Sequence, residues 1–185
     1  MNKRITIGQK QLDIPIIQGG MGVGISLGGL AGAVMKEGGM GVISAAHPGY
    51  SRDDFWQDSF AANQAALYEE VAKARKLSQG RGMLGVNVMV ASQRYEDYVK
   101  TAIEAGADAI ISGAGLPMNL PSVAGSETVA LAPIVSSGRA ARLILKSWDR
   151  HYQRTPDFIV VEGSLAGGHS VSYTHLRAHE TLRHL

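Results

Sequence analysis

The stretch Phe158-Ile159-Val160-Val161-Glu162-Gly163-Ser164-Leu165-Ala166-Gly167-Gly168-His169 decides the fold class. Its first four residues are β-branched or aromatic, which predicts a buried strand. The strand runs into a glycine-rich loop that carries a histidine, whose imidazole titrates near neutral pH. In parallel α/β proteins, ligands bind at the loops that follow the carboxyl ends of strands. The stretch therefore fits either an ordinary strand-to-helix turn with a solvated histidine or a ligand-binding loop.

The same alternation of strand, loop and helix runs through the preceding sequence. Apolar runs predict strands over residues 14–18, 40–44, 83–90, 109–112, 129–135 and 158–161. Helical spacing predicts helices over residues 26–36 with Ser26 as N-cap, 52–79 as one helix or two, 95–104 and 139–151. Six alternations favour an α/β fold, an incomplete TIM (β/α) barrel with about six of eight strand-helix units. Periodicity leaves an open doubly wound sheet as the alternative.

Composition limits the class of protein. Hydrophobic residues make up 45% of the 185 residues and charged residues 18%, which is typical of a compact globular domain. The net charge of +2 is nearly balanced and no basic stripe is present, so no nucleic-acid partner is expected. The absence of cysteine excludes disulfides and thiolate chemistry. Because no signal peptide or membrane-spanning apolar run occurs, we expect no membrane association and a cytoplasmic location.

The first glycine-rich loop does not fit a dinucleotide site. Gly22-Val23-Gly24 begins a GxGxxG pattern, but Leu27 stands where the third glycine belongs, and no acidic residue follows the second strand to bind a ribose. The glycines are expected to allow close approach of a planar or phosphorylated ligand. His47, before the Pro48-Gly49 turn, is expected to be a loop residue without a role.

Asn87 interrupts the apolar strand predicted over residues 83–90. Burying an amide without a hydrogen-bond partner costs roughly 1–3 kcal/mol, so this side chain needs a partner. It is either a satisfied structural amide or, if the carboxyl end of the strand faces a site, a group that points at a ligand.

Six short motifs carry a resemblance to a known family. They are Pro15-Ile16-Ile17-Gln18-Gly19-Gly20-Met21, Leu30-Ala31-Gly32-Ala33-Val34, Gly38-Gly39-Met40-Gly41-Val42-Ile43, Gly85-Val86-Asn87-Val88-Met89, Gly113-Ala114-Gly115 and Ala166-Gly167-Gly168-His169. In this order they resemble the nitronate monooxygenases, formerly called 2-nitropropane dioxygenases, a family that includes flavin-dependent enoyl-acyl-carrier-protein reductases. The resemblance extends over about residues 10 to 169, and several ordered motifs are more specific than any one alone.

The resemblance implies that residues 1–169 form part of an FMN-binding TIM barrel. The residues that it implies as FMN contacts are Gln18, Gly20, Met21, Gly22, Asn87, Glu162, Gly167 and Gly168. His169 matches the family's active-site histidine. It would bind the nitro oxygens of a nitronate or take the α-proton of a neutral nitroalkane as general base. The unperturbed pKa of histidine, about 6.5, suits a general base at neutral pH.

The function that the resemblance implies is FMN-dependent oxidation of an alkyl nitronate or nitroalkane by O2. The alternatives are an FMN- and NAD(P)H-dependent enoyl-acyl-carrier-protein reductase, an inactive truncated fragment of such an enzyme, and a non-catalytic flavodoxin-like binding module. The sequence leaves the physiological substrate and the oligomeric state open.

Residues 170–185 depart from the family pattern. They contain three of the six histidines and resemble translated sequencing-adapter read-through, so we expect this tail to be a sequencing artefact. His175 and His179 stand at i, i+4, but His179-Glu180 followed by His184 misses the HExxH spacing by one residue. No metal site is therefore expected.

If the family pattern ends at residue 169, the last two strand-helix units of the barrel are missing. In TIM barrels the loops after strands 7 and 8 frequently hold the cofactor's phosphate, and six strands leave two unpaired sheet edges. We therefore expect the 185-residue chain, expressed alone, to aggregate or to retain little FMN. A yellow, monomeric and well-folded product on size-exclusion chromatography would contradict this expectation.

Overall fold

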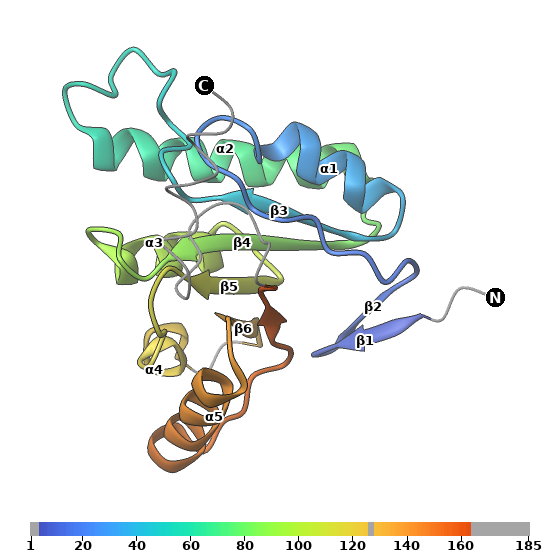
Figure 1. The fold of residues 1–185 in the computed structure, drawn as a ribbon. Helices are drawn as coiled ribbons and strands as arrows, with labels where there is room; N and C mark the ends of the chain where they lie inside the picture. Colours follow the sequence, from blue (N-terminus) through green and yellow to red (C-terminus); the bar gives the residue numbers. More distant parts are fainter. Residues whose placement is uncertain (1–3, 126–127, 164–185) are drawn as a thin grey trace, which may run out of the picture.

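A computed structural model describes residues 4–125 and 128–163. Its elements, in chain order, are β1 Ile5–Ile7, β2 Lys10–Leu12, α1 Gly28–Lys36, β3 Met40–Ser44, α2 Ser59–Ser78, β4 Met83–Met89, α3 Tyr95–Glu104, β5 Ala109–Gly113, α4 Leu120–Ala124, β6 Ala130–Val135, α5 Gly138–Tyr152 and β7 Val160–Val161. β3 to β7 pair in sequence order as a five-stranded parallel sheet, and β1 pairs with β2 in an antiparallel hairpin (Figure 1).

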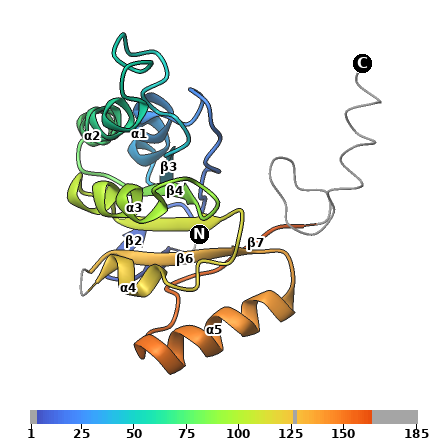
Figure 2. The same cartoon turned by 90° about the vertical axis from the view of Figure 1, so that its left-hand side faces the viewer.

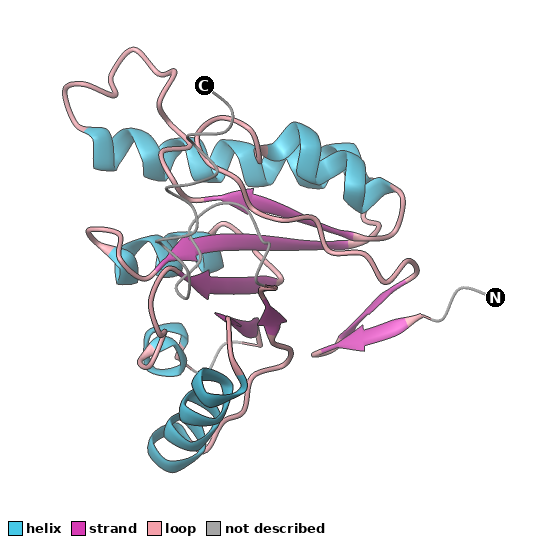
Figure 3. Ribbon diagram, viewed as in Figure 1, coloured by secondary structure: helices cyan, strands magenta, loops and turns pink. Residues whose placement is uncertain are grey.

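Each crossover between neighbouring parallel strands carries a helix, from α2 to α5 in turn. The helices share one buried cluster with one face of the curved sheet. Figure 2 shows α1 and α2 at one edge of the sheet and α5 at the other, and the arrowheads of β3, β4 and β5 point the same way (Figure 3). This arrangement confirms the predicted incomplete TIM barrel, with five of its strands present as parallel sheet. In the described ranges no helix is both long and apolar enough to cross a membrane.

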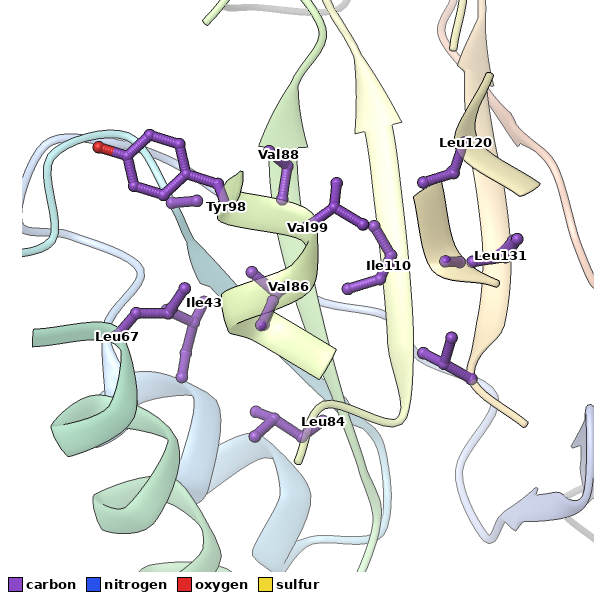
Figure 4. Close-up of a cluster of buried hydrophobic side chains, with 14 of the residues drawn as sticks. Ile43, Leu67, Leu84, Val86, Val88, Tyr98, Val99, Ile110, Leu120 and Leu131 are labelled. Carbon is purple, nitrogen blue, oxygen red and sulfur yellow. The ribbon is translucent and has the colours of Figure 1, made fainter. Parts of the chain in front are cut away.

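Side chains alternate between the two faces of the sheet. Leu84, Val86 and Val88 of β4 face the helices and belong to the larger buried cluster, in which strand residues pack on Leu67, Tyr98 and other helix residues (Figure 4). Burying one such aliphatic side chain contributes about 1.5–3 kcal/mol. The opposite, inner face carries a second buried cluster, which includes Met40, Met83, Ala109 and Ala130.

The N-terminal hairpin was not predicted, because its strands have three residues each and Met1 to Lys10 reads as polar. Gly8 makes the turn with a φ of +56°, a conformation that glycine adopts without steric cost. Ile7 and Leu12 join the inner cluster, and Figure 1 shows the hairpin at the end of the sheet opposite the arrowheads. The hairpin therefore covers the amino-terminal end of the half-barrel.

Asp108, directly before β5, ties the hairpin to the sheet and to α2. Its carboxylate contacts Lys10 Nζ of β2, lies 2.7 Å from Arg75 Nη2 of α2, and accepts a hydrogen bond of 2.8 Å from the Leu84 amide. Its side chain is only 8% exposed. Burial alone would raise the pKa of Asp108, but the hydrogen bonds from Arg75, Lys10 and Leu84 outweigh it and hold the pKa below its ordinary value.

Several local predictions differ from the structure. Of residues 14–18, only Ile17 forms a bridge with Met40, and Pro15 supplies no amide hydrogen for a ladder. Ser26 does not cap α1, whose N-cap is Leu27, because the Ser26 hydroxyl is bound in the preceding loop. Residues 59–78 form the single long helix α2, and the short helix α4 was not predicted.

Replacing Asp108 with Asn is expected to lower the free energy of unfolding by about 2 kcal/mol at pH 7, the scale of hydrogen bonds to a buried charge. Because the folded-state pKa of Asp108 lies below the unfolded value of about 3.9, its contribution is present above that pH and is lost as the pH falls through the folded-state pKa. Urea unfolding at several pH values measures the effect. Asp53→Asn, at an exposed site without an ion pair in the described ranges, is the control, and an equal loss in both variants would contradict the role of Asp108.

Candidate functional site

A cavity of about 380 Å³, which we call the site cavity, opens at the carboxyl edge of the sheet. Residues from the ends of the strands and from the loops beside them form its walls. The lining residues are Gly20, Met21, Gly22, Val23, Ser44, Ala46, His47, Asn87, Met89, Gly113, Ala114, Ile134 and Glu162.

The position of the site cavity follows from the parallel sheet. Ser44, Met89 and Gly113 are the last residues of β3, β4 and β5, and Glu162 directly follows β7. Parallel strands bring all their carboxyl ends to one edge, where the inner-face side chains of consecutive strands meet. The structure thus gathers residues that lie more than a hundred positions apart in the sequence.

Asn87 stands on the inner face of β4, beside Ser44 in the register of β3 and β4. Its side chain is partly exposed to the site cavity, and its carboxamide forms no hydrogen bond with another residue of the described ranges. Of the two interpretations of the sequence, the geometry favours the amide that points at a ligand. Its amide nitrogen can donate and its oxygen can accept a hydrogen bond.

Gly20, Met21 and Gly22 bring the loop before α1 to the same cavity. A Cβ on Gly20 would lie 2.5 Å from the Cβ of Asn87, so the loop backbone packs directly on that side chain. The glycine is therefore needed for close approach to the protein itself. Met21 is 59% exposed and offers an apolar side chain to a ligand.

Gln18 does not line the site cavity. Its Oε1 accepts a hydrogen bond of 3.0 Å from the Val42 amide, and its Nε2 donates to the Val42 carbonyl at 3.1 Å. Nε2 also lies 2.9 Å from Ser26 Oγ, which accepts a hydrogen bond from the Met21 amide. These hydrogen bonds hold the loop before α1 against β3, and Gln18 itself is not part of the wall of the site cavity.

Glu162 reaches the site cavity because its amide donates a 2.8 Å hydrogen bond to the Val135 carbonyl, which continues the pairing of β7 with β6. Its side chain is half-buried. Among the described residues that line the site cavity, Glu162 is the acidic one, and none is a lysine or an arginine.

His47 lines the site cavity, although the sequence analysis expected it to have no role. It adopts a φ of +50°, and its Nδ1 lies 3.5 Å from the Nδ2 of buried Asn63. The sequence signal that could have identified His47 is its position three residues after β3, because the other candidate residues also lie in loops that follow strands.

Three predicted site residues, Gly167, Gly168 and His169, lie outside the described residues. The tail histidines His175 and His179 do so as well. Within the ranges that the structure describes, no group of three histidine, cysteine, aspartate or glutamate residues could hold a metal ion.

The chain is similar in fold to two solved structures of FabK from Thermotoga maritima. The first has a TM-score of 0.65 and 25% sequence identity, and the match covers 85% of this chain and 43% of that one. The second, a point mutant, has a TM-score of 0.60 and 25% identity, over 81% of this chain and 44% of that one. This chain thus spans less than half the length of the FabK chains that it matches. A comparison with curated proteins found no match.

The sequence profile of the family described as Nitronate monooxygenase matches residues 3–183. The match runs through most of residues 170–185, so the predicted boundary at residue 169 and the foreign origin of the tail stay predictions. Since the profile covers nearly the whole sequence, this chain belongs to the nitronate monooxygenase family.

Proposed function

We propose that the site cavity holds the ring of FMN and that the whole protein oxidises alkyl nitronates or nitroalkanes with O2. The family is one of FMN-dependent oxidoreductases that act on small molecules. The observation that carries the proposal is the meeting of five predicted FMN contacts in one cavity. These are Gly20, Met21, Gly22, Asn87 and Glu162.

The residues of the site cavity fit an isoalloxazine ring, which is flat, largely apolar on its faces and polar along one edge. Met21, Met89 and Ile134 supply apolar contacts for the faces. The carboxamide of Asn87 can both donate and accept, and the carboxylate of Glu162 can accept from a ring N–H. The described lining offers no cation for the FMN phosphate, which agrees with phosphate binding by other loops in TIM barrels.

Bound FMN would supply the redox capacity that passes electrons from the substrate to O2. The chain's own residues would bind and orient the substrate, and the apolar wall favours a small alkyl group. His169 would take the α-proton of a neutral nitroalkane onto its imidazole. A nitronate has already lost that proton, so the same imidazole would instead donate a hydrogen bond to the nitro oxygens.

The similarity to FabK at 25% identity favours a second function, the enoyl-acyl-carrier-protein reductase. In that reaction NAD(P)H is the reductant and an enoyl thioester is the hydride acceptor. Both functions use the same flavin site, so substrate preference separates them. A chain that binds no FMN at saturating concentration would instead be the inactive fragment.

Replacing Asn87 with Ala is expected to weaken FMN binding about tenfold, because a hydrogen bond to the flavin ring is lost. Flavin fluorescence during titration of the purified 185-residue chain with FMN measures the affinity, whether or not flavin survives purification. Asn119→Ala is the matched control, since the Asn119 carboxamide donates to Glu96 and is not part of the cavity wall. Equal FMN affinities in the two variants would remove Asn87 from the flavin site.

Replacing His169 with Asn is expected to slow O2 uptake with a neutral nitroalkane by about 100-fold or more, the usual contribution of a general base. With the corresponding nitronate the loss should be smaller, because no proton is removed. Oxygen-electrode rates with FMN-reconstituted protein measure both values. Rapid NAD(P)H oxidation with a crotonyl thioester, without O2 uptake from a nitronate, would favour the reductase over the proposed oxidation.

A further inference from the structure

Met21 differs in its exposure from the other methionines that the structure describes. It is 59% exposed, whereas Met35 is fully buried and Met83 is 1% exposed. Met89 and Met118 are partly buried. Protein atoms around a buried thioether shield it from dissolved oxidants, so exposure decides which methionine is oxidised first. Met21 is therefore the described methionine that an oxidant in the site cavity reaches most readily.

The backbone of Met21 is fixed at both of its polar groups. Its amide donates a 2.9 Å hydrogen bond to the Ser26 hydroxyl, and its carbonyl accepts one of 2.9 Å from the Ser26 amide. The next residue is pressed against the cavity wall, since a Cβ on Gly22 would lie 2.7 Å from the Cβ of Ala46. Gly20 packs equally closely on β4. A chemical change at the Met21 side chain thus stays in the cavity wall, because the loop backbone has no room to move it away.

Hydrogen peroxide is the oxidant that this cavity would meet. In the proposed oxidation O2 accepts electrons, and O2 that takes up two electrons and two protons becomes hydrogen peroxide. The sulfur lone pair of Met21 would attack one peroxide oxygen, so that an S–O bond forms as the O–O bond breaks. The sulfur loses two electrons and becomes a sulfoxide. The other oxygen leaves as hydroxide and becomes water when it takes the proton from the transferred oxygen.

Oxidation would change the character of the cavity wall. Met21, Met89 and Ile134 supply the apolar contacts that we assign to the faces of the flavin ring. A sulfoxide is polar, whereas the thioether that it replaces is apolar. Its oxygen would lose water against the ring without gaining a hydrogen bond, which is unfavourable. Oxidised protein should therefore bind the ring more weakly.

We propose that Met21 is a peroxide-modification site in the site cavity and that its oxidation to the sulfoxide weakens flavin binding. The proposal rests on the proposed function for its ligand and its source of peroxide. Reductases return methionine sulfoxide to methionine, so the modification would be reversible. The protein would thereby lower its own flavin occupancy when peroxide accumulates.

The first measurement is the rate at which each methionine gains an oxygen atom when the flavin-free 185-residue chain is treated with hydrogen peroxide. Trypsin releases Met21 and Met35 in one peptide, from Gln11 to Lys36, because no lysine or arginine lies between these ends. Fragmentation in the mass spectrometer assigns the oxygen to one methionine or the other, and buried Met35 is the internal control. Met21 is expected to be oxidised about tenfold faster than Met35, because only Met21 is open to solvent.

The second measurement is the Kd for FMN before and after peroxide treatment, from flavin fluorescence. Oxidation of the wild type is expected to raise the Kd about tenfold, the effect of a polar group without a partner against the ring. Met21→Leu carries an apolar side chain that lacks sulfur, so its Kd, whatever the starting value, should not change on treatment. Met118→Leu is the matched control, since it keeps Met21 and Met118 is not part of the cavity wall. It should lose affinity as the wild type does, and methionine sulfoxide reductases should restore both.

Three results would each overturn the proposal. They are equal oxidation rates for Met21 and Met35, an unchanged Kd in the oxidised wild type, and a loss of affinity in Met21→Leu as large as in the wild type. The oxidation rates are measured without flavin, which keeps them apart from the proposed function. Untreated protein that binds no FMN would refute the flavin site, whereas selective oxidation of Met21 would still support the modification site.

Discussion

The alternation of side chains along the parallel strands is the constraint on which both the core and the site depend. In β4, Leu84, Val86 and Val88 face the helices, whereas Asn87 and Met89 face the inside of the half-barrel. A one-residue shift of this strand would turn the Asn87 carboxamide into the helix-facing core and would expose apolar side chains in its place. The site cavity therefore exists only in the register that buries the hydrophobic core.

Paired hydrogen bonds from side chains fix that register. The Asp108 amide donates to the Leu84 carbonyl at 2.8 Å, while the Asp108 carboxylate accepts from the Leu84 amide at 2.8 Å. Asp157 repeats the arrangement with Leu131, at 3.0 and 2.8 Å, two strand pairs further along the sheet, where it joins the start of β7 to β6. Each aspartate thus locks the start of its own strand to a single residue of the neighbouring strand. Because the strands are parallel, their carboxyl ends then lie side by side at one edge of the sheet, where their last residues form the wall of the site cavity.

Much of the fold could be predicted because the information is local. The apolar strands β3 to β6 and the helix over residues 95–104 follow from periodicity and from the glycines that end them. The hairpin β1–β2 could not, since it is stabilised by Ile7 and Leu12 packing on residues far along the chain. The strand expected over residues 14–18 failed for a related reason. The Gln18 side chain takes the hydrogen bonds of Val42 that a backbone neighbour would otherwise make.

At the site, sequence indicates which residues reach the carboxyl edge but not what each one touches there. Among the described residues, five that are not glycine have a positive φ, and Gln79 and Gln153 simply end α2 and α5. The other three, His47, Arg94 and Ala114, line one cavity of about 480 Å³ beside the loops after β3 and β4. A left-handed backbone costs roughly 1–2 kcal/mol per residue outside glycine, and such strain gathers where a side chain must be aimed. Histidine is among the residue types enriched in this backbone region, whereas arginine and alanine are not, so residue type alone does not identify Arg94 and Ala114 in the sequence.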